Sequence, residues 1–122
     1  MKVAITSSGN SLDSKLDLRF GRAGCFIVVD TESGAHEVIA NEQNVKALQG
    51  AGVQAGKNVV DTGVEAVITG NVGPKAYRTL QAAEIKVYVY PDDTATVQEA
   101  LERFKKGELQ EAFEANVSGH WM

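Results

Sequence analysis

The chain has 122 residues, of which 43% are apolar and 23% are charged, with a net charge of −4 and two prolines. This length fits one domain that can bury a core without disulfides, and the composition excludes a disordered or low-complexity chain. The mild acidity, with no clustered basic face, excludes a general nucleic-acid binder. The single cysteine allows no intramolecular disulfide, and no stretch has the length of a secretory signal or a membrane span. We therefore expect a cytoplasmic protein that contacts neither nucleic acid nor membrane.

The first part of the chain predicts an antiparallel meander. Residues 2–6 form a β-branched run that ends in the polar turn of residues 7–11. Residues 12–24 mix charged and single apolar residues too irregularly for a long helix, so we expect a folded loop or a single turn there. Residues 25–30 are continuously apolar, and residues 35–40 form a second extended run after a glycine-containing turn. This arrangement predicts a hairpin.

The middle of the chain predicts a helix, a buried strand and a second helix. Residues 52–62 have helical spacing, with Gly63 as the C-terminal stop. Gly56 costs this helix about 1 kcal/mol relative to alanine, and a close approach to the sheet or to a ligand would explain it. The apolar run over residues 66–70 then predicts a strand that passes through a tight glycine turn into a helix starting at Pro74.

The last part predicts one more strand and helix. Residues 85–90 alternate as a strand, and Thr96 with Glu99 forms a capping box that begins a helix ending near Gly107. In the tail, residues 108–122, the spacing of the apolar residues predicts a short helical turn followed by a disordered end.

These elements predict one three-layer α/β/α domain over residues 1–107, with a mixed five-stranded sheet. The sheet combines the three-stranded meander with two right-handed crossovers. The same layout occurs in ribonuclease H-like folds, whose nucleases hold two metal ions with acidic residues on the first strand. Residues 3–6 read Val-Ala-Ile-Thr, so nuclease activity is not expected. No nucleophile paired with a base is evident, and we expect a protein that is not an enzyme.

Three glycine-rich loops predict an anion-binding cleft. They are residues 7–10, residues 50–52 and residues 70–73. If the first and fourth strands are parallel neighbours, the loops that follow them open at the same sheet edge, where backbone N–H groups converge. Arg19 and Arg22 would supply positive charge. For each glycine alone, the alternative is simple turn geometry.

Direct metal ligation by side chains has only weak candidates. Cys25, His36 and His120 lack the close spacing of a zinc site. Cys25 begins an apolar strand, where a free cysteine usually behaves as a small hydrophobe. His36 fits a half-exposed strand position, and His120 fits a disordered end.

Three segments together carry a resemblance to a known family. They are MKVAIT at the start, LDLRFGRAGCFIVVD over residues 16–30, and GAGVQAGKNVVDTGVEAVITGNVGPKAY over residues 50–77. In these motifs the chain resembles the dinitrogenase iron-molybdenum cofactor biosynthesis family, which includes NifX, the carboxyl-terminal part of NifB, the nitrogenase accessory factor and the orange protein. The resemblance implies a ribonuclease H-like domain, not a nuclease, that binds, carries or protects anionic metal-sulfur clusters containing iron or molybdenum.

Two departures from the family pattern bear on how a cluster would be held. Arg19 stands where members tied to nitrogenase often have histidine before Phe-Gly. Ala23 stands where many other members have cysteine after Phe-Gly-Arg, and Cys25 follows two positions later. Recognition through hydrogen bonds and charge is therefore favoured over ligation, and arginine binds anions through two parallel bonds.

We therefore expect non-catalytic binding, carrying or assembly of a non-covalently bound cluster with molybdenum, iron or both, with copper as a further option. Its partners would be the cluster or its precursor, cofactor-assembly proteins and a partner ATPase. The alternative is an interaction or regulatory module that works with an ATPase and binds a simple oxyanion or nothing. The motifs and loops together give the predicted binding set Ser7, Ser8, Asn10, Arg19, Phe20, Gly21, Arg22, Gly50, Gly52, Gly70, Asn71 and Gly73.

Overall fold

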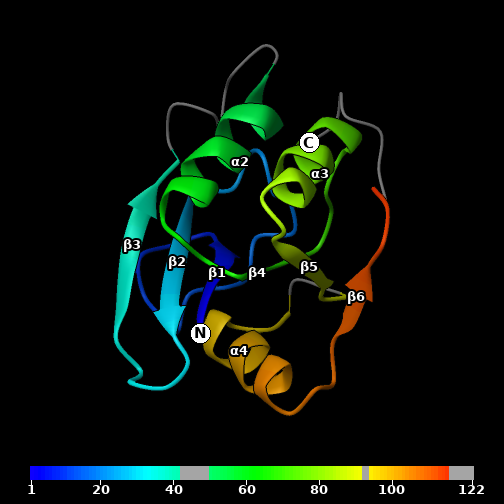
Figure 1. Cartoon of the computed structure of the whole chain (residues 1–122). Helices are drawn as coiled ribbons and strands as arrows, with labels where there is room; N and C mark the ends of the chain where they lie inside the picture. Colours follow the sequence, from blue (N-terminus) through cyan, green and yellow to red (C-terminus); the bar gives the residue numbers. More distant parts are fainter. Residues whose placement is uncertain (42–49, 92–93, 116–122) are drawn as a thin grey trace.

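The computed structural model describes residues 1–41, 50–91 and 94–115, which form a mixed sheet with helices on both faces (Figure 1). The elements are β1 (Lys2–Ser7), β2 (Cys25–Asp30), β3 (His36–Ala40), α2 (Ala51–Asp61), β4 (Ala66–Thr69), α3 (Pro74–Ala82), β5 (Lys86–Val89), α4 (Val97–Lys105) and β6 (Gln110–Ala112). The six strands lie in the order β3-β2-β1-β4-β5-β6. Within the described ranges, no helix is long and apolar enough to cross a membrane.

The directions of the strands confirm the predicted topology of the first five. Strand β1 pairs antiparallel with β2, which pairs antiparallel with β3. On its other side β1 pairs in parallel with β4, and β4 with β5. The chain thus forms a meander followed by two crossovers through α2 and α3.

The prediction of a five-stranded sheet is wrong, because the tail adds a sixth strand. The helical turn expected from Leu109, Ala112 and Phe113 is instead the short strand β6, which pairs antiparallel with β5. Three apolar residues are too few to sustain a helix by themselves, and the open edge of β5 offers backbone partners to an extended chain. The Tyr77 hydroxyl of α3 also donates to the Ala112 carbonyl at 3.0 Å.

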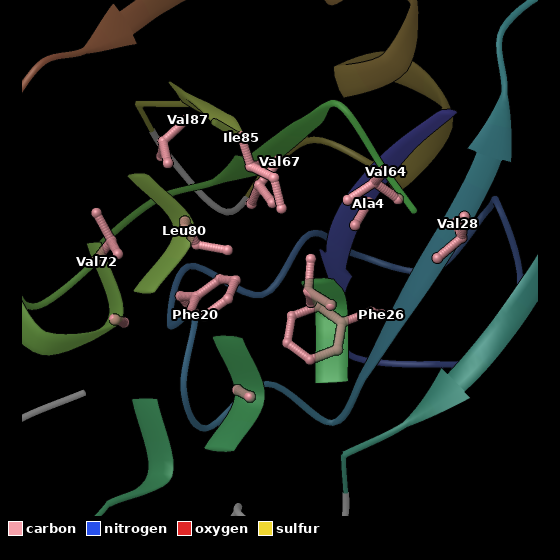
Figure 2. Packing of buried hydrophobic residues seen from close by; sticks show 13 residues of the cluster. Ala4, Phe20, Phe26, Val28, Val64, Val67, Val72, Leu80, Ile85 and Val87 are labelled. Carbon is pink, nitrogen blue, oxygen red and sulfur yellow. The ribbon is translucent and has the colours of Figure 1, made fainter. Parts of the chain in front are cut away.

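Alternate residues of the central strands belong to two hydrophobic clusters, one on each face of the sheet. Ala4 and Val67 belong to the cluster that packs under α2 and α3 (Figure 2). Their neighbours Ile5 and Ile68 belong to the cluster under α4. This alternation follows from the two-residue period of a strand and gives the molecule its three layers.

The helix ends follow the sequence signals. Helix α4 starts with the complete capping box of Thr96 and Glu99, and α3 starts at Pro74. Gly56, inside α2, is explained by a neighbouring helix, since a Cβ there would lie 3.0 Å from Thr79 Cγ2 of α3. The close approach is therefore to α3, and the expected approach to the sheet or a ligand is wrong.

Candidate functional site

The carboxyl ends of β1 and β4 meet in the middle of the sheet, at the position where open α/β sheets bind ligands. Here the crevice between them is filled by residues 15–20, which we call the strap. The Asp17 amide donates to the Thr6 carbonyl at 3.0 Å, and the Asn71 amide donates to the Leu18 carbonyl at 2.6 Å. The strap is thus hydrogen-bonded to the ends of both strands, and a ligand must bind outside it.

The strap is anchored by side chains that enter both cores. Leu16, 2% exposed, belongs to the cluster under α4, and Leu18 packs against the same cluster. Phe20 is fully buried in the other cluster, where its ring centroid lies 5.3 Å from that of Phe26. Phe20, one of the predicted binding residues, is therefore placed in the core, with no surface left for a ligand.

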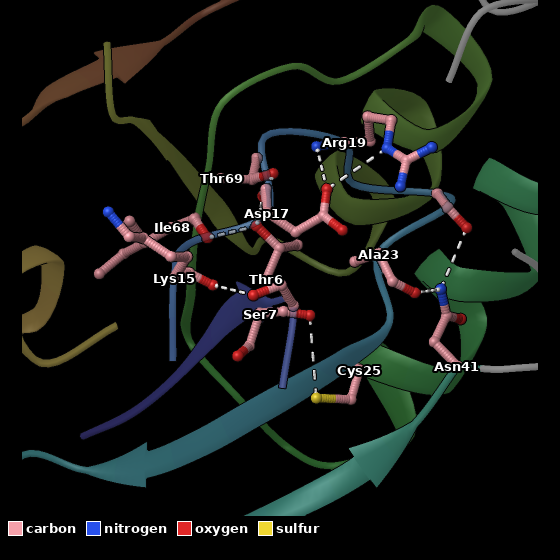
Figure 3. A network of polar contacts seen from close by, with 12 residues as sticks. Thr6, Ser7, Lys15, Asp17, Arg19, Ala23, Cys25, Asn41, Ile68 and Thr69 are labelled. Carbon is pink, nitrogen blue, oxygen red and sulfur yellow. Dashed lines mark hydrogen bonds and ion pairs between the residues drawn. The ribbon is translucent and has the colours of Figure 1, made fainter. Parts of the chain in front are cut away.

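Two buried threonines, at the ends of β1 and β4, fix the position of the strap. Thr6 Oγ1, at the end of β1, donates to the Asp17 carbonyl at 2.5 Å and lies 3.0 Å from Thr69 Oγ1 at the end of β4 (Figure 3). Because both hydroxyls are fully buried, these bonds satisfy groups that would otherwise be costly to desolvate. The position of the strap is thereby fixed.

Three glycines of the predicted binding set bring chain segments together. A Cβ at Gly70 would lie 2.5 Å from Leu18 Cδ2, so only glycine lets the strap cross over the end of β4. A Cβ at Gly21 would lie 2.9 Å from both Cα and N of Gly52, and one at Gly52 would lie 3.1 Å from Ala76 Cβ. The motif glycines therefore serve close packing of the strap, α2 and α3.

The first turns of α2 and α3 are adjacent, because a Cβ at Gly52 of one would lie only 3.1 Å from Ala76 Cβ of the other. Gly50 caps α2 in the left-handed region, with φ of 78°, and Gly73 caps α3 in an extended conformation. Neither helix has a side-chain cap or an acidic residue in its first turn. The positive ends of two helix dipoles thus lie side by side.

Asn41 fixes the loop that follows the strap. Its side chain is fully buried, and Nδ2 donates to the carbonyls of Gly21 at 3.1 Å and Ala23 at 2.8 Å (Figure 3). Hydrogen bonds therefore tie the backbone around Gly21 to the end of β3, and close packing places it against Gly52 in the first turn of α2.

A groove of about 660 Å³ runs along the strap. It is lined by Ser8, Lys15, Leu16, Asp17, Leu18, Arg19, Asn71 and Thr94. The structure thus brings together Ser8, Arg19 and Asn71 of the predicted binding set, which come from the loops after β1 and β4 and from the strap between them.

The groove carries two cations around one carboxylate. Lys15 Nζ donates to the Thr94 carbonyl at 3.1 Å. Arg19, whose side chain is 46% exposed, places Nε 3.4 Å from Asp17 Oδ1, and its backbone N–H donates to the same oxygen at 3.0 Å. Sequence reasoning missed Lys15, Asp17 and Thr94, because no local pattern separates them from ordinary surface residues.

Other members of the predicted binding set lie away from the groove lining. Ser7 is buried, and its Oγ donates to the Gly9 carbonyl at 2.6 Å. Asn10 is exposed but does not line the groove. Arg22 is half-buried beside Gly21, next to the first turn of α2. The predicted set is therefore dispersed: some members line the groove, others lie at the first turns of α2 and α3, and Ser7, Asn10 and Phe20 belong to neither region.

The three weak metal candidates are dispersed. Cys25 is buried, and its Sγ donates to the Gly9 carbonyl at 3.0 Å. His36 is exposed on β3, and His120 lies outside the described residues. Over residues 1–41, 50–91 and 94–115, no three His, Cys, Asp or Glu side chains gather in a group that could hold a metal ion.

We expect Cys25 to react with a disulfide reagent far more slowly in the native protein than in the unfolded chain. Burial raises the pKa of the Cys25 thiol and outweighs the hydrogen bond with Ser7, which lowers it, so the thiolate fraction at pH 8 is reduced. Reaction rates are measured from pH 7 to 10, with and without guanidinium. The rise in rate with pH should occur at a higher pH in the native protein than in the unfolded chain. Equal rates in the two states would show an accessible thiol.

The chain thus forms a small α/β domain whose groove, beside the strand ends, is lined by cations and hydrogen-bond donors. The chain belongs to the dinitrogenase iron-molybdenum cofactor family, whose pattern it matches over residues 1–107. The resemblance seen in the sequence motifs is thereby confirmed.

Known proteins are similar to this one in structure or sequence over almost the whole chain. The apo orange protein from Desulfovibrio gigas has a TM-score of 0.91 and 39% identity, covering 95% of this chain and 96% of that one. A NifB-like protein from Thermotoga has a TM-score of 0.83 and 42% identity, covering 97% and 98%. An uncharacterized protein from Methanocaldococcus jannaschii is 30% identical over 113 residues, which is 90% of each chain.

Proposed function

We propose that the chain binds and carries an anionic metal-sulfur cluster containing iron or molybdenum, or a precursor of one, without catalysing a reaction on it. Membership of the dinitrogenase iron-molybdenum cofactor family supports a role in handling such clusters. The observation that carries the proposal is the groove along the strap, where Lys15 and Arg19 face a common space. Proposed partners are the cofactor-assembly proteins that supply or receive the cluster in the cytoplasm.

The chemistry of the groove favours non-covalent binding. No thiol or imidazole is among the described residues that line it, whereas ammonium, guanidinium, hydroxyl and amide groups are. Such groups donate hydrogen bonds to sulfido and oxo ligands, and charge assistance roughly doubles the strength of these bonds. The volume of about 660 Å³ also falls within the range of about 300–1,000 Å³ that is typical of small-molecule sites.

The proposal is tested by adding tetrathiomolybdate to the purified protein, with and without ferrous or cuprous ions. We expect charge-transfer absorption that stays with the protein on gel filtration. The double variant Lys15→Ala/Arg19→Ala should bind at least about tenfold more weakly, because it removes two positive charges from the groove. Both side chains are exposed, so the stability should change by less than about 0.5 kcal/mol for each.

The double variant Lys57→Ala/Arg78→Ala is the charge-matched control. Lys57 on α2 and Arg78 on α3 are exposed and lie outside the groove lining, so this variant should bind as the unmodified chain does. No retained chromophore in the unmodified protein would contradict the proposed function. Normal binding by the groove variant, with loss in Arg22→Ala, would move the site to the first turns of α2 and α3.

A further inference from the structure

The groove contains a carboxylate where an anion site would be expected to exclude one. Asp17 lies between the two cations in the strap, and its side chain is only 12% exposed. Its Oδ1 accepts from the Arg19 backbone N–H at 3.0 Å and faces Arg19 Nε at 3.4 Å. A carboxylate held in this way repels any anion in the groove, and it repels a dianion about twice as strongly as a monoanion.

We propose that Asp17 is a specificity-determining residue, which favours a cargo whose sulfur anion already carries a metal cation over a bare dianion such as tetrathiomolybdate. The inference rests on the proposed function and deepens it. Lys15 and Arg19 attract the anionic rim of the cargo, and the carboxylate between them attracts its metal cation. Specificity of this kind comes from a repulsive element built against the wrong ligand.

A purely structural role for Asp17 predicts a different result. Its carboxylate bonds the backbone two residues ahead, as in an Asx turn. The amide oxygen of asparagine can accept the same bond, so Asp17→Asn keeps the turn, removes the charge and replaces the second carboxylate oxygen by an NH2 group. A change in ligand preference in this variant therefore reports the charge and not the turn.

The test measures the affinity for two probes by equilibrium dialysis with metal analysis. One probe is tetrathiomolybdate, a dianion. The other is the complex of this anion with one cuprous ion, and the complex has a net charge of −1. We expect Asp17→Asn to bind the bare dianion about tenfold more tightly and the copper-bearing monoanion at most about threefold more tightly. Lys15→Gln should weaken binding of both probes, and it should weaken binding of the dianion more than binding of the monoanion.

The possible outcomes distinguish a failure of the role proposed for Asp17 from a failure of the proposed function. Binding of both probes by the unmodified chain, with the same ratio of affinities in Asp17→Asn, would overturn the role of Asp17 and leave the proposed function in place. Equal weakening of both probes in Asp17→Asn would show a structural role and would also overturn the inference. Failure of the unmodified chain to bind either probe would overturn the proposed function itself. Far-ultraviolet circular dichroism checks that each variant is folded.

Discussion

Replacing Phe20 by alanine is expected to lower the free energy of unfolding by about 3–5 kcal/mol. The ring is fully buried and packs at 5.3 Å, with a 50° interplanar angle, against Phe26. Figure 2 shows it among the side chains of the same cluster, near Leu80 of α3 and Phe26 of β2. Its removal deletes a large apolar side chain and opens a cavity at the end of the strap. Urea unfolding followed by circular dichroism measures the loss.

The exposed Phe113 provides the matched control for this substitution. Its side chain is 78% exposed, so Phe113→Ala removes the same atoms from the surface and should cost less than about 0.5 kcal/mol. Phe20→Leu should lower the free energy of unfolding less than Phe20→Ala does, because leucine keeps most of the buried volume. Similar stabilities of Phe20→Ala and Phe113→Ala would contradict the role of Phe20 as an anchor of the strap.

Gly70→Ala should lower the free energy of unfolding by about 1–3 kcal/mol and weaken cluster binding. The new Cβ would lie 2.5 Å from Leu18 Cδ2 and 2.9 Å from Leu18 Cα. Rotation of the leucine side chain relieves only the first of these contacts, so the backbone of the strap must move. Asp17 and Arg19, on either side of Leu18, would then be displaced in the groove. Urea unfolding and the thiomolybdate titration measure the two effects.

Gly24→Ala is the control for this variant. Its Cβ would meet the nearest atoms, the carbonyl oxygens of Ser7 and Ser8, at 3.4 Å, which is ordinary van der Waals contact. It should therefore change both stability and binding much less than Gly70→Ala does. If Gly70→Ala were as stable as the unmodified chain, the close crossing of the strap over β4 would be wrong.

Most of the fold could be predicted because its elements carry strong local signals. The capping box of Thr96 and Glu99, the proline that begins α3 and the apolar runs of the central strands each specify one structure. Strand β6 carries no such signal, since three residues are too short to show a two-residue period. It forms because β5 has an unpaired edge, which is a property of the assembled sheet.

The lining of the groove, which remains a candidate site, matches the predicted residues only in part. The parallel pairing of β1 with β4, on which the predicted cleft depended, is confirmed. The strap was missed, although its apolar residues Leu16, Leu18 and Phe20 alternate with charged ones in the manner of an extended chain. The contact of Lys15 with Thr94 joins residues 79 positions apart, and no local pattern reports such a pairing.

The glycines show why a motif can be recognised before its purpose is understood. A loop that approaches an anion and a loop that approaches another backbone both need a residue without a side chain. Gly21 and Gly70 satisfy the second need, as their distances to Gly52 and Leu18 show. Geometry was therefore needed to tell close packing from an anion cradle.

The strap joins the two hydrophobic layers of the molecule, with Leu16 buried under α4 and Phe20 buried under α2 and α3. Lifting it would expose apolar surface on both faces of the sheet at once, so its local opening should cost almost as much as global unfolding. We therefore expect the backbone amides of the strap to be among the most slowly exchanging in the domain. A ligand bound in the groove would meet a backbone whose shape is already set, so that little conformational entropy of the strap would be lost on binding.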